Sequence, residues 1–146
     1  MDEAADNDFL VVTFSIQDSL IGIRSSEVEE IVRIPPITHV PNAPPYVLGI
    51  VNLRGRILTI LDISNRLGLG VTAAGDDSRI LIVTVKGESM GVLVPQLSDV
   101  VEIGKDEIKP MSGSVLGVSA DHFLGLFEKD DRLIALLDPE ATLMAP

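Results

Sequence analysis

The sequence predicts an all-β protein built from two similar halves. Short apolar runs rich in Val and Ile recur along the chain, and Gly, Pro, Asn or Asp residues separate them, which is typical of strands joined by turns. No segment keeps the apolar period of a long amphipathic helix. An internal repeat of two ungapped blocks, described below, relates the first half of the chain to the second.

The first part of the chain predicts a strand pair followed by an extended connector. Residues 10–16 are rich in β-branched side chains and predict a strand, and residues 20–23 predict a second strand that returns after a short turn. Ser26 followed by Glu29 is typical of a capping box, so we expect a short helical turn there. Prolines cluster between residues 35 and 45, where they fix the backbone and remove N–H donors, so this stretch cannot be a central strand.

The middle of the chain predicts a hairpin, a capped helical turn and a loop. Apolar residues 47–51 and 57–61 flank a polar segment that contains a glycine, which is the pattern of a β-hairpin. Asp62 or Ser64 is expected to cap a short helical turn that follows. Residues 68–78 are small, acidic and rich in glycine, so we expect a surface loop.

Two ungapped blocks of the chain repeat each other. A shift of 69 residues places 11–34 on 80–103, and most apolar positions of the first block meet apolar positions of the second. A shift of 76 residues places 46–67 on 122–143 with Gly, Arg, Asp and several Leu residues matched. The difference between the two shifts fits inside the connectors, so the pattern indicates a duplicated all-β unit.

The duplication predicts two halves, at about 9–70 and 79–144. In the second half, residues 80–85 and 90–94 predict another strand pair, and the remaining chain keeps the same alternation of short apolar runs and turns. Each half, at roughly 65–70 residues, is of marginal size for an independent core. We therefore expect the halves to pack on each other as two small barrels or sheets.

The two copies differ most clearly at their second hairpin turn. The first copy reads Asn-Leu-Arg-Gly at 52–55, and the second reads Glu-Lys-Asp-Asp at 128–131. Positions that are alike in both copies are expected to have a structural role, and positions that differ are expected to serve the specific function of the protein. The specific function is therefore expected near residues 52–55.

Composition excludes several classes of function. The chain has 22 Asp and Glu against 11 Lys and Arg, a net charge of −11, so nucleic acid is not an expected partner. Aromatic residues make up only 3%, which disfavours sugar binding and stacking on single strands, and the absence of Cys excludes disulfides and thiolate metal sites. The acidic segment 1–8 lacks the apolar core of a signal peptide, and no run of about 18 apolar residues exists, so no membrane insertion is expected.

No arrangement of residues predicts catalysis. Asp62 and Asp138 are equivalent under the repeat, and two such carboxylates could share a proton in a degenerate aspartic-protease-like enzyme. Neither is followed by the Thr/Ser-Gly that this chemistry needs, so we expect strand-end carboxylates that accept backbone N–H bonds. His39 and His122 have no further ligand at metal-binding spacing. We expect no catalytic residue, no metal and no cofactor, and a binding module is favoured.

One stretch of the sequence, residues 42–62, contains Asn-x-Pro, then Gly-x-x-Asn-Leu-Arg-Gly, then an apolar run that ends in Asp. These motifs resemble the signature of the CheW family, the coupling proteins of bacterial chemotaxis. Val-Glu-Glu-Ile at 28–31 and Leu-Ser-Asp-Val at 97–100 resemble two further segments of that family. The resemblance extends from about Phe9 to Leu143.

The resemblance implies a fold, a function and partners. The implied fold is two pseudo-symmetric, five-stranded SH3-like β barrels with short helical segments, in a single CheW-like domain over 1–146. The implied function is that of a non-catalytic cytoplasmic adaptor, monomeric in isolation, which is recruited to membrane-associated receptor arrays. Its partners would be the cytoplasmic tip of chemoreceptors and the regulatory domain of the chemotaxis histidine kinase.

Alternatives within and outside the family stay open at this point. The same module occurs as the regulatory domain of the kinase and fused to a receiver domain, and the length of the chain argues against a fusion. An adaptor of a non-flagellar chemosensory pathway, such as pilus-driven motility instead of swimming, is a further alternative. From a different class, a carbohydrate- or peptide-binding β module outside signalling would require the signature to be coincidental.

The resemblance also implies a set of partner-binding residues. They are Val28, Glu30, Ile31, Gly49, Asn52, Leu53, Arg54 and Gly55.

Physical roles can be proposed for several of them. Arg54 is expected to pair with Glu30 and hold the loop. The aligned residues of the second copy are Asp99 and Asp130, which cannot pair, so the role of the pair is expected to be specific to the first half. An apolar groove lined by residues of this set would accept a helix face of the receptor.

Three further expectations concern packing and the C-terminus. Val28 and Leu53 are the expected apolar anchors of the groove. Gly49 is matched by Gly125, so a backbone-packing role in both halves is favoured for it. A short C-terminal helix is expected to begin near Pro139, because proline is accepted at the first helical position.

Overall fold

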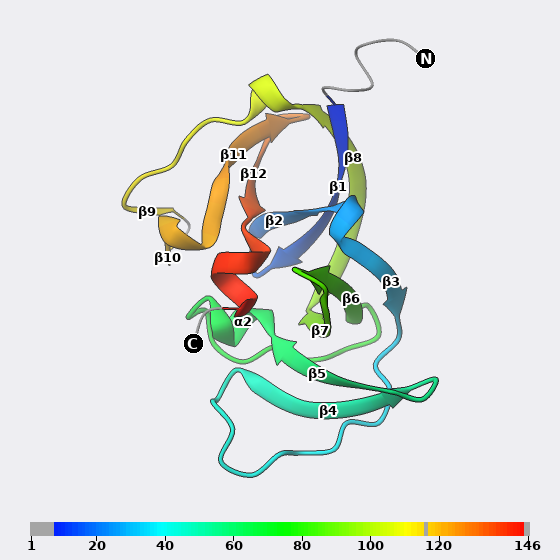
Figure 1. The fold of residues 1–146 in the computed structure, drawn as a ribbon. Helices are drawn as coiled ribbons and strands as arrows, with labels where there is room; N and C mark the ends of the chain where they lie inside the picture. The colour runs from blue at the N-terminus through cyan, green and yellow to red at the C-terminus, as the bar shows by residue number, and fades with distance from the viewer. Residues whose placement is uncertain (1–7, 116, 145–146) are drawn as a thin grey trace.

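The computed structural model describes residues 8–115 and 117–144, and most of this part of the chain is β-strand (Figure 1). The acidic N-terminal segment considered above lies outside the described residues up to residue 7. The strands are β1 (Asp8–Ile16), β2 (Ser19–Arg24), β3 (Val28–Val32), β4 (Val47–Leu53), β5 (Arg56–Asp62), β6 (Arg79–Val85), β7 (Glu88–Val94), β8 (Gln96–Gly104), β9 (Ser114–Val115), β10 (Val118–Ser119), β11 (Phe123–Lys129) and β12 (Arg132–Leu137). The helical segments are η1 (Ser25–Glu27), α2 (Ile63–Arg66), η2 (Lys105–Glu107), η3 (Ala120–His122) and η4 (Glu140–Met144).

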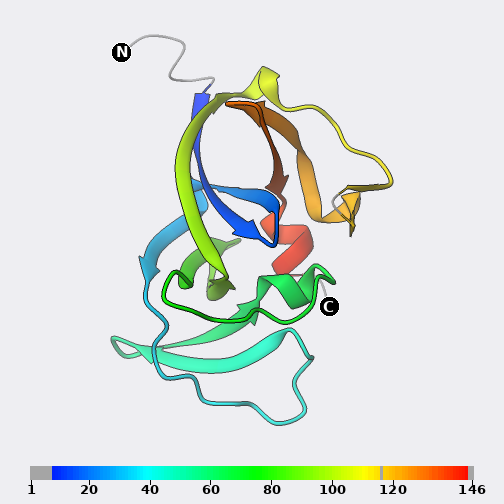
Figure 2. The same cartoon turned by 180° about the vertical axis from the view of Figure 1, so that it is seen from behind.

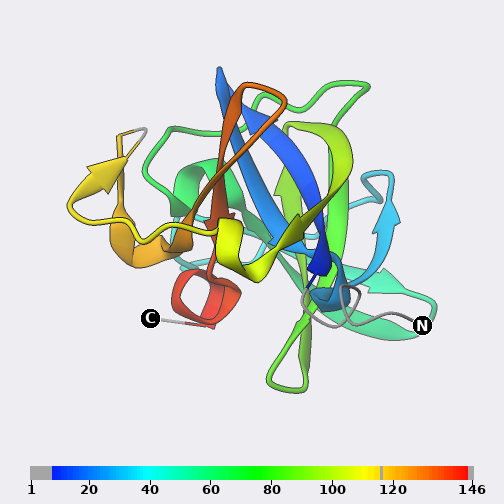
Figure 3. The same cartoon turned by 90° about the horizontal axis from the view of Figure 1, so that it is seen from above.

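Two five-stranded sheets confirm the predicted all-β fold with two SH3-like barrels. The first barrel has the strand order β3-β6-β7-β5-β4, and the second has the order β11-β12-β2-β1-β8. In the views of Figures 1 and 2 the second barrel lies above the first. Viewed from above, the small β9–β10 pair projects from the side of the second barrel (Figure 3).

The internal repeat maps each strand of one barrel onto a strand of the other. Strands β1 to β5 correspond in order to β6, β7, β8, β11 and β12, and this substitution converts one sheet order into the other. The parallel contacts also correspond, because Ile60 pairs with Gly91 in the first barrel and Leu136 pairs with Gly22 in the second. The barrels are therefore pseudo-symmetric in strand order and in register.

The sheets divide the chain differently from the sequence repeat. Strand β3 pairs with β6, and its counterpart β8 pairs with β1, so each copy gives its third strand to the other copy's first hairpin. The first barrel consequently consists of the continuous segment 28–94, whereas the second combines strands from 8–24 with strands from 96–137.

Three apolar clusters fill the molecule. One lies inside the first barrel around Ile60 and Ile80, and one lies inside the second around Phe127 and Ile134. The largest cluster includes residues of both sheets, such as Phe14 of β1, and joins the barrels through a shared core.

Two-residue turns connect the hairpins. Arg54 and Gly55 join β4 to β5 with φ of 53° and 83°, and Lys86 and Gly87 join β6 to β7 with φ of 50° and 80°. Both residues of each turn are left-handed, which matches the twist of the flanking strands. The strands of the predicted hairpin at 47–61 therefore extend further toward the turn than the apolar runs alone indicated.

The short helical turn expected near Ser26 forms as η1, but the capping box expected at Ser26 and Glu29 is wrong. Segment η1 begins at Ser25 after Arg24, and no side chain caps it. Glu29 lies in β3, at a bulge where the pairing shifts between Val28 and Glu30. The bulge directs its carboxylate to Arg56 of β5, so a tertiary ion pair replaces the local cap.

The two short helical turns after β5 and β12 form as expected. Asp62 caps α2, because its carboxylate accepts hydrogen bonds from the backbone N–H of Ser64 at 3.0 Å and of Asn65 at 3.5 Å. Segment η4 follows Pro139 and lies beside α2 (Figures 1 and 2), where Arg66 Nε donates to the carbonyl of Thr142 at 2.6 Å.

Candidate functional site

The tip of the β4–β5 hairpin is shaped by Asn52, Arg54 and Gly55. The side-chain oxygen of Asn52 accepts a hydrogen bond from the backbone N–H of Gly55 at 2.9 Å, which stabilises the turn. A Cβ on Gly55 would meet nothing within 4 Å, so its φ of 83° is the reason for glycine here. The turn leaves the Arg54 side chain exposed.

Two ion pairs join the hairpin to β3. Arg54 donates a hydrogen bond to Glu30, and Arg56 donates one to Glu29 at 3.1 Å. Glu29 and Glu30 lie on β3, an outer strand of the first sheet. Arg56 lies on β5 and Arg54 lies in the turn between β5 and the other outer strand, β4, so these pairs join β3 to the β4–β5 hairpin at the barrel rim. The side chain of Arg54 is 65% exposed and that of Glu30 is 36% exposed, so the predicted pair forms at the surface.

Glu29 is the most strongly perturbed carboxylate of this rim. Hydrogen bonds from Arg56, Ser89 and Thr84 lower the pKa of Glu29 to about 2. The three donors come from β5, β7 and β6, so one carboxylate connects four strands of the first barrel.

Exposed apolar side chains flank the ion pairs. Ile31 follows Glu30 on β3 and is 39% exposed, and Ile57 follows Arg56 on β5 and is 61% exposed. Sequence reasoning missed Ile57. Alternation along β5 could have found it, because Leu58 and Ile60 point into the barrel core while Ile57 and its neighbour two residues on point outward.

Val28 and Leu53, the two residues expected to be apolar anchors of the groove, pack largely against the cores. Val28 is half-buried and packs against the shared core, and Leu53 is half-buried and packs against the core of the first barrel. Exposed apolar surface next to the hairpin tip therefore comes from Ile31 and Ile57 rather than from Val28 and Leu53.

Gly49 lies away from the hairpin tip, beneath the proline-rich connector. Thr38 and Ile50 exchange backbone hydrogen bonds of 2.8 Å across it, and a Cβ on Gly49 would collide with the carbonyl oxygen of Thr38. In the second barrel a Cβ on Gly125 would lie 2.6 Å from the carbonyl oxygen of Lys109. Both glycines thus admit a second backbone segment at close range, which is the packing role expected for Gly49.

The rim of the second barrel carries a different ion pair. Asp99, the counterpart of Glu30, bonds Arg132 at 3.2 Å, and Arg132 is the counterpart of Arg56. Asp130, the counterpart of Arg54, takes no part in this pair. Val100 and Leu133, which correspond to Ile31 and Ile57, are also exposed. The second barrel therefore keeps the apolar pair and one ion pair, and lacks the cation at the hairpin tip.

The carboxylates of the two strand-end aspartates accept hydrogen bonds from backbone N–H groups. The carboxylate of Asp62 is 1% exposed and, besides capping α2, accepts a hydrogen bond from the backbone N–H of Thr72 at 2.9 Å. Asp138 accepts one from the backbone N–H of Ala141 at 3.2 Å. Both carboxylates are thus engaged in local structure, as expected from strand-end positions.

Neither histidine belongs to a metal cluster in the described part of the chain. Within residues 8–115 and 117–144, no three His, Cys, Asp or Glu side chains gather in a way that could hold a metal ion. Burial and the nearby Arg66 lower the pKa of His122, which favours its neutral form. Among the same residues, no helix has the length and apolar content required to cross a membrane.

Comparison with known proteins places this fold and its signature in one family. The family model described as CheW-like domain matches residues 10–145. A chemotaxis protein CheW from Rhizobium meliloti is 30% identical over 128 residues, which cover 88% of this chain and 83% of that protein. One from Treponema pallidum is 27% identical over 137 residues, covering 91% and 81%.

A solved structure agrees with these matches. The crystal structure of the scaffolding protein TtCheW from Thermoanaerobacter tengcongensis is similar with a TM-score of 0.82 at 32% sequence identity. The alignment covers 89% of this chain and 84% of that chain.

Proposed function

The chain belongs to the CheW-like domain family, and on that basis we propose that it couples the cytoplasmic tip of chemoreceptors to the regulatory domain of a chemotaxis histidine kinase. The family consists of non-catalytic scaffold and adaptor proteins, and the chain is accordingly a chemotaxis adaptor and not an enzyme. In the proposed role the protein works in the cytoplasm, where receptor arrays recruit it. Its two barrels act as one domain because they share the largest core.

The observation that carries the proposal is the exposed Glu30–Arg54 pair. An ion pair between solvent-exposed side chains contributes little to stability, so an architectural role does not explain it well. The second barrel, built on the same plan, forms without a cation at the position of Arg54. Arg54 is therefore the residue at this rim that is best placed to serve a partner.

The chemistry around the pair suits the apolar face of a partner helix or sheet with charges at its border. Ile31 and Ile57 are exposed apolar residues next in sequence to the ion-paired Glu30 and Arg56, and Glu30 and Arg54 supply a charge of each sign at the rim. Asn52, Leu53 and Gly55 contribute through the shape of the hairpin tip, and Val28 and Gly49 contribute by supporting β3 and β4 from within.

Co-sedimentation with receptor cytoplasmic fragments and kinase tests the proposal. The wild-type protein is expected to enter a ternary complex, and Arg54→Asp is expected to be lost from it while its circular dichroism spectrum stays unchanged. Lys105→Asp makes the same change of charge at an exposed residue of η2, on the second barrel's side, and is expected to behave like the wild type. Failure of the wild-type protein to assemble with its cognate receptor and kinase would contradict the coupling role.

A further inference from the structure

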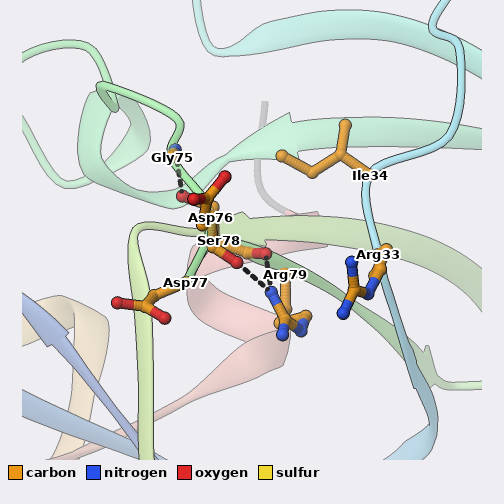
Figure 4. Close-up of a pocket in the computed structure, with 7 residues that line it drawn as sticks. All are labelled: Arg33, Ile34, Gly75, Asp76, Asp77, Ser78 and Arg79. Carbon is orange, nitrogen blue, oxygen red and sulfur yellow. Dashed lines mark hydrogen bonds between the residues drawn. The ribbon is translucent and has the colours of Figure 1, made fainter.

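A hollow of about 600 Å³ lies where the connector leaves β3, at the side of the first barrel (Figure 4). Arg33 and Ile34 line it from the connector, and residues 75–79 line it from the loop that enters β6. In Figure 4 the guanidinium groups of Arg33 and Arg79 lie next to each other, while the carboxylates of Asp76 and Asp77 point to other sides.

The strand register brings the two arginines together. Val32 of β3 pairs with Ile80 of β6, so the next position along each antiparallel strand places Arg33 beside Arg79. Like charges directly opposite each other on neighbouring strands are destabilising unless an anion compensates them. Within the described residues, neither arginine has an ion pair with a carboxylate. This is unexpected in a chain with twice as many acidic as basic residues.

Arg79 is held in position by its own loop. Its Nη1 donates to the carbonyl oxygens of Asp76 and Ser78, both at 2.7 Å. Ser78 is 2% exposed, donates from its hydroxyl to the carbonyl of Pro95 at 2.8 Å and accepts from the N–H of Gly75 at 2.9 Å. A guanidinium on such a fixed loop loses little freedom when it binds a ligand.

The internal repeat shows that this pair of charges is not part of the common barrel plan. The corresponding positions of the second barrel are Glu102 and Leu10, which pair with each other between β8 and β1. A Leu and a Glu satisfy the same place in the sheet, so the barrel fold does not require two arginines there.

We propose that Arg33 and Arg79 form a binding site for one oxyanion, a carboxylate or a phosphate group, in this hollow. Guanidinium groups bind both anions through paired, charge-assisted hydrogen bonds, and two of them side by side match one such group. The anion can be free in solution or belong to an acidic or phosphorylated side chain of another protein. The site lies apart from the hairpin tip and does not depend on the coupling function.

The test is a titration of the ¹⁵N-labelled full chain, followed through the arginine Nε–Hε resonances by NMR. Inorganic phosphate is added in one arm and succinate in the other, at the same low ionic strength. Saturable shifts of the Arg33 and Arg79 resonances are expected in at least one arm. Arg33→Gln and Arg79→Gln are each expected to weaken binding about tenfold, because each removes a hydrogen bond from a charged donor. Lys105→Gln is expected to leave binding unchanged.

Every outcome of the titration bears on the site. Binding of succinate identifies a carboxylate site, binding of phosphate alone identifies a phosphate site, and both support the proposal. Shifts that do not saturate, or an affinity that survives Arg33→Gln, would overturn it. Arg33→Gln is decisive because the described structure shows no hydrogen bond from the Arg33 side chain, so this variant keeps the fold even if Arg79→Gln disturbs the loop.

Discussion

Arg132 at the start of β12 donates a hydrogen bond to Asp99 of β8, with 3.2 Å between Nη2 and Oδ2. Their counterparts in the first barrel, Arg56 and Glu30, do not bond each other, because Arg56 pairs with Glu29 and Glu30 pairs with Arg54. The first rim thus has two ion pairs where the second has one, and Arg54 is the added cation. This comparison separates the part of the rim that builds a barrel from the part that is available to a partner.

Reversing the Glu30–Arg54 pair distinguishes a contact from a purely architectural pair. Arg54→Asp is expected to change the free energy of unfolding by less than about 1 kcal/mol, because the pair is exposed. The double variant Glu30→Arg with Arg54→Glu restores an ion pair with the charges exchanged. We expect it to be as stable as the wild type in urea denaturation and still absent from the ternary complex. Recovery of binding in the double variant would show that the pair acts only by holding the loop.

Gly49→Ala is expected to destabilise the protein more than Gly125→Ala. The new methyl group would collide with the Thr38 carbonyl, and alanine would also be strained at the Gly49 φ of 150°. Overpacking and backbone strain together are expected to lower the unfolding free energy by about 2–4 kcal/mol. Gly125→Ala suffers the overpacking alone, about 1–3 kcal/mol. Chemical denaturation of both variants measures the difference, and equal losses would contradict the role of the φ angle.

The Glu29 cluster predicts a loss of stability in acid. The folded-state pKa of Glu29, about 2, lies below the ordinary value of 4.5, so the folded protein binds this proton less readily than the unfolded chain. Its stabilising effect is therefore complete above about pH 4.5 and disappears as the pH falls toward 2. Glu29→Gln is expected to flatten the pH dependence of the unfolding midpoint across this window.

The control for the acid experiment is another glutamate of the same barrel. Glu88 of β7 is exposed and forms no ion pair within the described residues, so Glu88→Gln is expected to keep the wild-type pH profile. If both variants show the same profile, the acid sensitivity comes from other groups.

Asp62→Ala is expected to cost more stability than Asp138→Ala, although the two positions are equivalent in the repeat. Asp62 is buried and accepts backbone hydrogen bonds from Ser64, Asn65 and Thr72, so its loss leaves several donors without a partner. We expect about 3 kcal/mol for Asp62 and about 1 kcal/mol for Asp138, which accepts the Ala141 N–H. Thermal unfolding of the two variants checks which one loses more stability. Adding a pepsin-type inhibitor is expected to leave the unfolding temperature of each variant unchanged.

Local patterns in the sequence predicted the features that depend on neighbouring residues. Alternating β-branched residues mark the strands, Asp62 marks the start of α2, and the match of Gly49 with Gly125 marks a packing position. The Glu30–Arg54 pair was expected between two positions that the family resemblance singled out, and the broken counterpart in the second copy indicated a role specific to the first half. In each case the signal lies within a short segment or in the comparison of two aligned segments.

Features that depend on pairing between distant strands could not be predicted in this way. The exchange of β3 and β8 between the sheets leaves no trace in hydrophobic periodicity, because both strands alternate whichever neighbour they have. The expected capping box at Ser26 was wrong for the same reason, because the Glu29 carboxylate pairs with Arg56 on β5, a strand that is distant in sequence. The neighbouring arginines at 33 and 79 become visible only when β3 is paired with β6.

The exchange of third strands also sets an order for folding during synthesis. All strands of the first barrel emerge from the ribosome before β8, β11 and β12 do, so that barrel can close while the β1–β2 hairpin still lacks both of its neighbours. An isolated hairpin is marginally stable, but Phe14 and Ile21 can already dock against the first barrel through the shared core. Pulse-labelled hydrogen exchange is expected to protect β6 and β7 before β1 and β8. In the nascent chain, β1 and β2 would then pack against the completed first barrel until β8 and β12 emerge and pair with them.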